Sequence, residues 1–142
     1  MDKNKKVTWA DKRGSWSIYV ELNTKITTQS INQSYFGNPV VGDSKSALDS
    51  IYSIFKTTRE IVTIYGDDGK QLAGLAFKML NEELRPFATK WHVIFTEVNP
   101  IDINKYYGVE FQENLKRLQS DLSPYVDKFL EMSNTDDLLL DK

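Results

Sequence analysis

The sequence predicts an all-α protein, an antiparallel bundle of three to four helices. Apolar residues recur at three- and four-residue steps over long stretches, and the links between several of these stretches are short. At 142 residues, with 40% hydrophobic and 27% charged residues, the chain has the size and composition of one globular domain. We expect a flexible N-terminal arm over residues 1–10, a single bundle domain over 11–133 and a flexible acidic, leucine-bearing tail over 134–142.

The first helix is the hardest to predict. Alternate apolar positions in residues 16–26 are typical of a half-buried strand. The spacing of Trp16, Tyr19 and Asn23 also fits one face of a helix. A lone strand would have nothing to pair with, so we predict a helix here. The following segment, 34–42, is then expected to be a surface loop.

The clearest helix is predicted from about Leu48 to Tyr65. Its apolar stripe consists of Leu48, Ile51, Tyr52, Phe55, Val62 and Tyr65. Gly66 can adopt the left-handed conformation that ends many helices, and residues 67–69 then form a short turn. So short a link predicts an antiparallel hairpin with the next helix.

The next helix is predicted from about Lys70 to Glu97, and it contains a proline. Its core-facing residues are Leu72, Leu75, Ala76, Met79, Leu80, Phe87, Trp91 and Ile94. Pro86 cannot donate to the carbonyl of Glu82 and crowds that turn, so we expect a kink or break, at a cost of about 3 kcal/mol unless packing compensates. A last helix is predicted near Gly108 to Ser133, with a bend or restart at Pro124.

A polar stripe follows the proline-containing helix. Arg85 and the only histidine, His92, are seven residues apart, which places them within about 20° of each other around a helix axis. Glu82 and Thr89 fall on the same side. We therefore predict that Glu82, Arg85, Thr89 and His92 form one exposed face, which is the candidate functional site.

The composition excludes several chemistries. The chain has no cysteine and one histidine, which removes disulfides, thiolate catalysis and the usual transition-metal sites. We therefore predict no metal and no cofactor. The net charge of −2 gives no bulk attraction to nucleic acid or anionic membranes. No apolar run approaches the length of a signal peptide or a bilayer span, so we expect a soluble, cytoplasmic protein without membrane contact.

Three stretches of the chain carry a resemblance. They are WSIYVELNTKITTQ at 16–29, ALDSIYSIFKTTRE at 47–60 and LRPFATKWH at 84–92. In these stretches the chain resembles a set of small uncharacterised bacterial helical proteins that have the same signatures in the same order. That group is similar to components of mobile defence or conflict loci. The resemblance implies a helical fold, a prokaryotic origin and a place in a multi-component, antiviral system.

The pair Arg85 and His92 also resembles the motif of the HEPN superfamily. The ribonucleases of that superfamily are helical bundles with an arginine, four to six intervening residues and a histidine. The resemblance implies a metal-independent endoribonuclease, usually assembled as a homodimer. In it His92 moves the proton of the 2′-hydroxyl and Arg85 stabilises the charged phosphorane. Two features depart from the pattern: Pro86 stands where a polar residue is typical, and the motif does not lie on the last helix.

Structural roles compete with each of these assignments. A lone histidine beside a tryptophan is more often structural than catalytic, and Glu82 with Arg85 can be an ordinary helical ion pair. Trp9 and Trp16, near the start of the chain, can anchor a partner.

We therefore predict a non-catalytic protein-interaction or adaptor subunit. Its binding residues are Glu82, Arg85, Thr89, His92, Trp9 and Trp16, and the leucines of the tail form a second contact surface. The expected partner is another protein or a second copy of the chain. The alternative is the HEPN-like ribonuclease with Arg85 and His92 as catalytic residues, and a nucleic acid is expected as partner only in that case.

Overall fold

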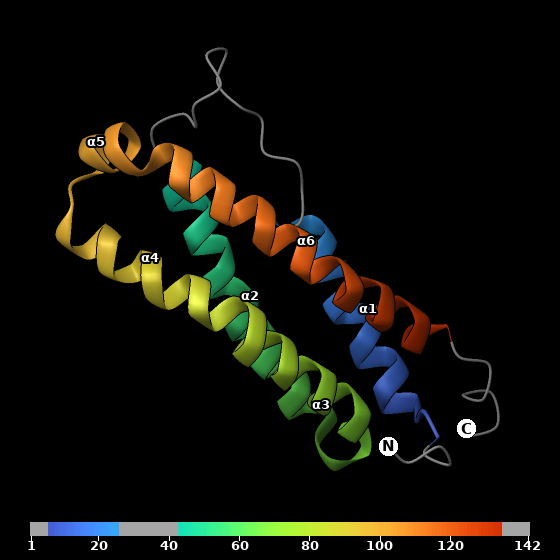
Figure 1. Cartoon of the computed structure of the whole chain (residues 1–142). Coiled ribbons are helices and arrows are strands. Elements are labelled where there is room, and N and C mark those ends of the chain that lie inside the picture. Colours follow the sequence, from blue (N-terminus) through green and yellow to red (C-terminus); the bar gives the residue numbers. More distant parts are fainter. Residues whose placement is uncertain (1–5, 26–42, 135–142) are drawn as a thin grey trace.

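The computed structural model describes residues 6–25 and 43–134, and all of their regular structure is helical. The longest runs are α1 (Trp9–Thr24), α2 (Asp43–Tyr65), α3 (Lys70–Lys78) followed by α4 (Arg85–Glu97), and α6 (Gly108–Ser133). Successive runs point in opposite directions (Figure 1). The predicted all-α, antiparallel fold is therefore confirmed. The loop expected at 34–42 and the tail beyond Asn134 lie outside the described residues.

The first helix is confirmed, but it begins seven residues before the predicted segment. The Thr8 hydroxyl accepts a hydrogen bond from the backbone N–H of Asp11 at 3.0 Å, and the Asp11 carboxylate accepts one from the backbone N–H of Thr8 at 3.1 Å. This reciprocal pair is a capping box, which satisfies N–H groups that a helix start leaves unpaired. Ala10 is buried. Residues 8–10 therefore belong to the bundle and not to the arm expected over 1–10.

The helical hairpin between α2 and α3 forms as predicted. Gly66 has a φ of +54°, the left-handed conformation that glycine adopts without strain. A 3₁₀ turn (Gly66–Gly69) then leads directly into α3. Leu72, near the start of α3, packs closely against Gly14 of α1: a methyl group added at Gly14 would lie 2.1 Å from Leu72 Cδ2. The absence of a side chain at Gly14 thus lets α1 approach α3.

The proline-containing run is not broken in the way the sequence predicted. α3 and α4 are joined by a π-helical turn (Met79–Leu84), in which the backbone N–H of Arg85 donates to the carbonyl of Leu80, five residues back. Pro86 follows this turn, at the start of α4, where its missing N–H is least costly. The irregularity expected at Pro86 is therefore a wider turn just before it. The last helix matches its predicted bounds and continues through Pro124.

One core joins the helices. α1 packs against α6, α2 and α3, and α2 packs against α4. Between α4 and α6 lies an aromatic cluster in which Trp91 is fully buried, with its ring centroid 4.9 Å from that of Phe111. Its other members are Phe87, Phe95 and Tyr107. Phe87 and Trp91 thus have the core role that their spacing indicates.

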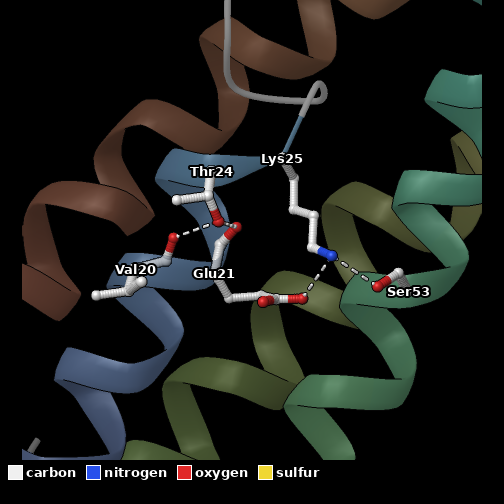
Figure 2. Close-up of polar contacts among 5 residues, drawn as sticks. All are labelled: Val20, Glu21, Thr24, Lys25 and Ser53. Atoms are coloured by element: carbon white, nitrogen blue, oxygen red, sulfur yellow. Dashed lines mark hydrogen bonds and ion pairs between the residues drawn. The ribbon is translucent and has the colours of Figure 1, made fainter.

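A small polar cluster fixes the end of α1 to α2 (Figure 2). Lys25 Nζ lies 3.2 Å from the Glu21 carboxylate, one helical turn earlier, and donates to the Ser53 hydroxyl of α2 at 2.9 Å. The Thr24 hydroxyl donates to the carbonyl of Val20 at 2.8 Å. The last turn of α1 is therefore held at both its backbone and its side chains. A short α5 (Pro100–Asp102) and a second π-helical turn (Ile103–Tyr107) connect α4 to α6.

Candidate functional site

An open groove of about 440 Å³ lies between α2 and α4. We call it the α2–α4 groove. It is lined by Tyr52, Phe55, Arg59, Arg85, Ala88, Thr89, His92 and Val93. Three of these residues come from α2 and five from α4, and the two helices are in direct contact. The groove therefore combines basic, hydroxyl-bearing and apolar side chains.

The groove contains three of the four residues of the predicted polar stripe. Arg85, Thr89 and His92 line it and are exposed. Glu82 does not; it lines a separate depression of about 320 Å³ between α4 and α6, beside Glu83. A π-helical turn, whose hydrogen bonds join residues five apart, holds one residue more than an α-helical turn. That extra residue corresponds to about 100° of rotation around the helix axis. The π-helical turn thus separates Glu82 from the other three, so the expectation that all four share one face was wrong, whereas a binding role for Glu82 stays a prediction.

His92 is held by a hydrogen bond across the groove. Its Nδ1 lies 2.9 Å from the Tyr52 hydroxyl, and the two rings meet edge to face with centroids 6.2 Å apart. Burial, and secondarily the charge of Asp49, raises the pKa of Tyr52, so its phenol keeps the proton. A protonated phenol can donate to Nδ1 or accept from it, according to which imidazole nitrogen carries the proton. When the phenol donates, the neutral imidazole carries its own proton on Nε2.

Arg85 is positioned by contacts on two sides. Its Nε and Nη2 donate to Asn81 Oδ1 at 3.2 and 3.0 Å, and its guanidinium carbon lies 5.7 Å from the centroid of the Phe55 ring. Asn81 thus takes the place of Glu82, the ion-pair partner that we considered from the sequence. These contacts use one edge of the guanidinium. Within the part of the chain that the structure describes, the edge formed by Nη1 and Nη2 is free to bind a carboxylate or phosphate.

The groove is a basic surface on a chain of net negative charge. None of the described residues that line it is acidic, and among the described residues neither Arg59 nor Arg85 forms an ion pair with a carboxylate. The depression between α4 and α6 differs, because it mixes both signs of charge. Two unneutralised guanidiniums, one from each helix, attract an anionic group. Phe55 and Val93 supply apolar surface beside them.

The two candidate tryptophans lie on α1, outside the groove. Trp9 is 50% exposed, with its ring edge-to-face against Tyr65 and the Arg13 guanidinium 5.1 Å from its centroid. Trp16 is 51% exposed and stacks on Tyr19. Each tryptophan therefore has an intramolecular ring contact and a free face. They form a second exposed surface that is separate from Arg85 and His92.

The contribution of α2 to the site was not predicted from the sequence. Tyr52 and Phe55 were assigned to a core stripe, yet Tyr52 is 38% exposed and bonds to His92. Arg59 was not considered at all. The signal was present, because Tyr52, Phe55 and Arg59 follow the three- and four-residue spacing of one helix face. An aromatic and basic stripe on one helix opposite a basic stripe on the next is a pattern worth testing as a shared groove.

The described residues contain no group of three or more histidine, aspartate or glutamate side chains arranged to hold a metal ion. In the same part of the chain, no helix is long and apolar enough to cross a bilayer. Comparisons with protein-family models, curated proteins and solved structures gave no match.

Proposed function

We propose that the protein is a non-catalytic binding subunit and that the α2–α4 groove receives an acidic, partly apolar segment of a protein partner. The observation that carries this proposal is the pair of unneutralised guanidiniums, Arg59 and Arg85, beside Phe55 and Val93. A carboxylate satisfies the free edge of Arg85, while an aliphatic side chain covers the apolar wall. An adaptor of a bacterial multi-component, antiviral system is the role that this site and the resemblance of the chain support together.

The groove lies between two packed helices, which favours binding over chemistry. His92 Nδ1 is taken up by Tyr52, and Arg85 is held by Asn81. Both side chains are therefore positioned before any ligand arrives, which lowers the entropic cost of binding. The net charge of −2 also opposes the approach of a long polyanion more than that of a short acidic peptide.

The HEPN-like ribonuclease is the second candidate, and one observation favours it. Arg85 and His92 line the same groove, so both border the space that a bound RNA segment would occupy. In that case His92 Nε2 faces the substrate, because Nδ1 is bonded to Tyr52. Such a site needs both side chains individually, whereas a binding groove needs the charge of Arg85 more than the basicity of His92.

A peptide-display experiment tests the binding function. The wild type and an Arg59→Glu, Arg85→Glu double variant are each used to select from a library of random peptides displayed on phage. Peptides that mix aspartate or glutamate with aliphatic residues should be enriched by the wild type and not by the variant. If the wild type enriches no class of peptide that the double variant fails to enrich, the proposal is contradicted.

An RNA assay tests the alternative. Wild type, Arg85→Ala and His92→Ala are incubated with RNA without added metal, after circular dichroism has shown equal folding. Our proposal expects RNA to stay intact with all three proteins. If the wild type cleaves RNA and both substitutions abolish the cleavage, the protein is a nuclease and the proposal of a binding subunit is wrong.

A further inference from the structure

We infer that the groove's occupant is the acidic, leucine-bearing segment Asp136–Asp141 of a second copy of this chain. The inference rests on the proposed function, because it names the partner of the same groove. It makes the protein self-associating through a groove on one copy and a peptide on the other. That arrangement is heterologous, so each copy keeps one groove and one segment for further partners.

The first argument is chemical complementarity. The segment reads Asp-Asp-Leu-Leu-Leu-Asp, with three carboxylates around three leucines. The groove offers Arg59 and Arg85 for the carboxylates, and Phe55 and Val93 for the leucines. The free edge of Arg85 binds a carboxylate through two parallel hydrogen bonds. Charge and apolar surface therefore match within one short peptide.

The second argument is that Asp136 and Asp137 of a chain do not extend to Arg85 of the same chain. The Ser15 hydroxyl donates to Met132 Sδ, and one turn earlier on α1 Asp11 accepts from the N–H of Leu72. These contacts place the end of α6 beside the start of α3. Arg85 lies about 20 Å further along the helical run than Leu72.

The reach of the segment decides between the two sources. Asp136 and Asp137 follow Asn134 by two and three residues, so even a fully extended chain carries them at most about 10 Å from it. They fall short of Arg85 of the same copy, where only Asp141, seven residues beyond Asn134, has enough chain to reach it. The segment of a second copy can bring all three carboxylates to the groove. The geometry thus favours association between molecules over folding back within one.

A fluorescence anisotropy titration tests the contact directly. The probe is a labelled peptide of residues 134–142. The receptor is the full chain with Asp136→Asn and Asp137→Asn, so that its own segment does not compete. We expect saturable binding that weakens at least about tenfold when Arg85→Glu is added to the receptor. The matched control is Lys116→Glu, the same charge change on the exposed face of α6, which should alter the affinity less than about twofold.

Sedimentation equilibrium of the full chain provides the second readout. Wild type should associate reversibly, and both the Arg59→Glu, Arg85→Glu variant and an Asp136→Lys, Asp137→Lys variant should sediment as monomers. Mixing the two variants should restore association, because the reversed charges complement each other across the interface. Restoration supports the inference, and association that persists in either variant alone overturns it.

Peptide display separates this inference from the proposed function. If the display selects acidic peptides through Arg59 and Arg85 but the 134–142 peptide does not bind, the proposed function stands. The inference that a second copy of the chain occupies the groove is then wrong. If neither binds, both fail. If RNA displaces the bound peptide and is cleaved, the groove is a nucleic-acid site and both fail.

Discussion

Asp11 on α1 accepts a hydrogen bond from the backbone N–H of Leu72 on α3 at 2.9 Å, across sixty-one positions of sequence. Its other carboxylate oxygen accepts from Thr8 within the capping box. One buried carboxylate therefore caps two helices, and a negative charge at two helix starts is favourable to both dipoles. The Asp11 side chain, in the first turn of α1, therefore also ties α3 to α1.

Asp11→Ala should lower the free energy of unfolding by about 2–3 kcal/mol, because it removes a cap and leaves two N–H groups without an acceptor. Urea denaturation followed by circular dichroism measures the change. Asp49→Ala is the control: Asp49 is exposed and pairs with Lys45 one turn away, so its loss should cost less than about 0.5 kcal/mol. Equal effects for the two variants would contradict the capping role.

Gly14→Ala should destabilise the protein by about 1–3 kcal/mol, because the new methyl group overlaps Leu72, which is itself fully buried. Gly74→Ala is the matched control within α3. Nothing lies within 4 Å of the methyl group there, so the higher helix propensity of alanine should stabilise the protein by about 0.5–1 kcal/mol. Thermal unfolding should show shifts of opposite sign; shifts of the same sign contradict the close approach at Gly14.

We predict that the Tyr52 hydroxyl donates to His92 Nδ1, an arrangement that requires one tautomer of the neutral imidazole. Because the chain has a single histidine, a ¹⁵N-labelled sample gives one pair of ring nitrogen signals. At neutral pH we expect Nε2 to carry the proton and Nδ1 to be an acceptor. Tyr52→Phe should shift the population toward the other tautomer, whereas Tyr106→Phe, at a highly exposed position, should leave the signals unchanged. A dominant Nδ1–H form in the wild type refutes the assigned donor.

Tyr125 predicts a loss of stability in strong alkali. Burial first, and then Glu83 and Glu82, raise its pKa from 10.0 to about 12. The unfolded chain loses this proton at lower pH than the folded one. The stabilisation is thus complete below pH 10 and is lost as the pH rises toward about 12.

Absorbance at 295 nm and chemical denaturation between pH 9 and 12 measure both effects of the Tyr125 ionisation. Tyr125→Phe should remove the phenol whose pKa is about 12 and should flatten the dependence of the free energy of unfolding on pH in this range. An unchanged profile contradicts the assignment to Tyr125.

The repeating spacing of apolar residues was enough to predict the fold. The stripes on α2 and α6 predicted two long helices, and the bounds of α6 match. Gly66 was correctly expected to end α2, because few residues other than glycine adopt a positive φ. The start of α1 was missed, since the capping box formed by Thr8 and Asp11 was not recognised in the sequence.

The candidate site was predicted less completely, because it depends on two helices and on a change of helical pitch. Arg85, Thr89 and His92 share a face because they lie within one regular helix. Tyr52 belongs to another helix, and its pairing with His92 is not encoded in the spacing of either. The error at Glu82 came from treating Lys70–Glu97 as one ideal α-helix.

That error has a signature in the sequence itself. Buried residues recur at strict four-residue steps through the run: Leu72, Ala76, Leu80, Leu84 and Ala88. In an ideal α-helix each step of four drifts by about 40°, so five such positions spread over about 160°. The extra residue of the π-helical turn cancels most of this drift. A run of apolar residues at four-residue steps was therefore a readable signal for a wider turn.

The π-helical turn also decides where this helix can lose a residue. Deleting one exposed residue of the turn, Asn81 or Glu82, would convert it to ordinary α-helix, and everything after it would keep its orientation relative to α3, because the turn holds one residue more than an α-helical turn. Deleting one residue of α4 before Trp91 would instead rotate the residues that follow by about 100° and move Trp91 out of the core. A single codon lost at the wide turn would thus be tolerated better than one lost a turn later.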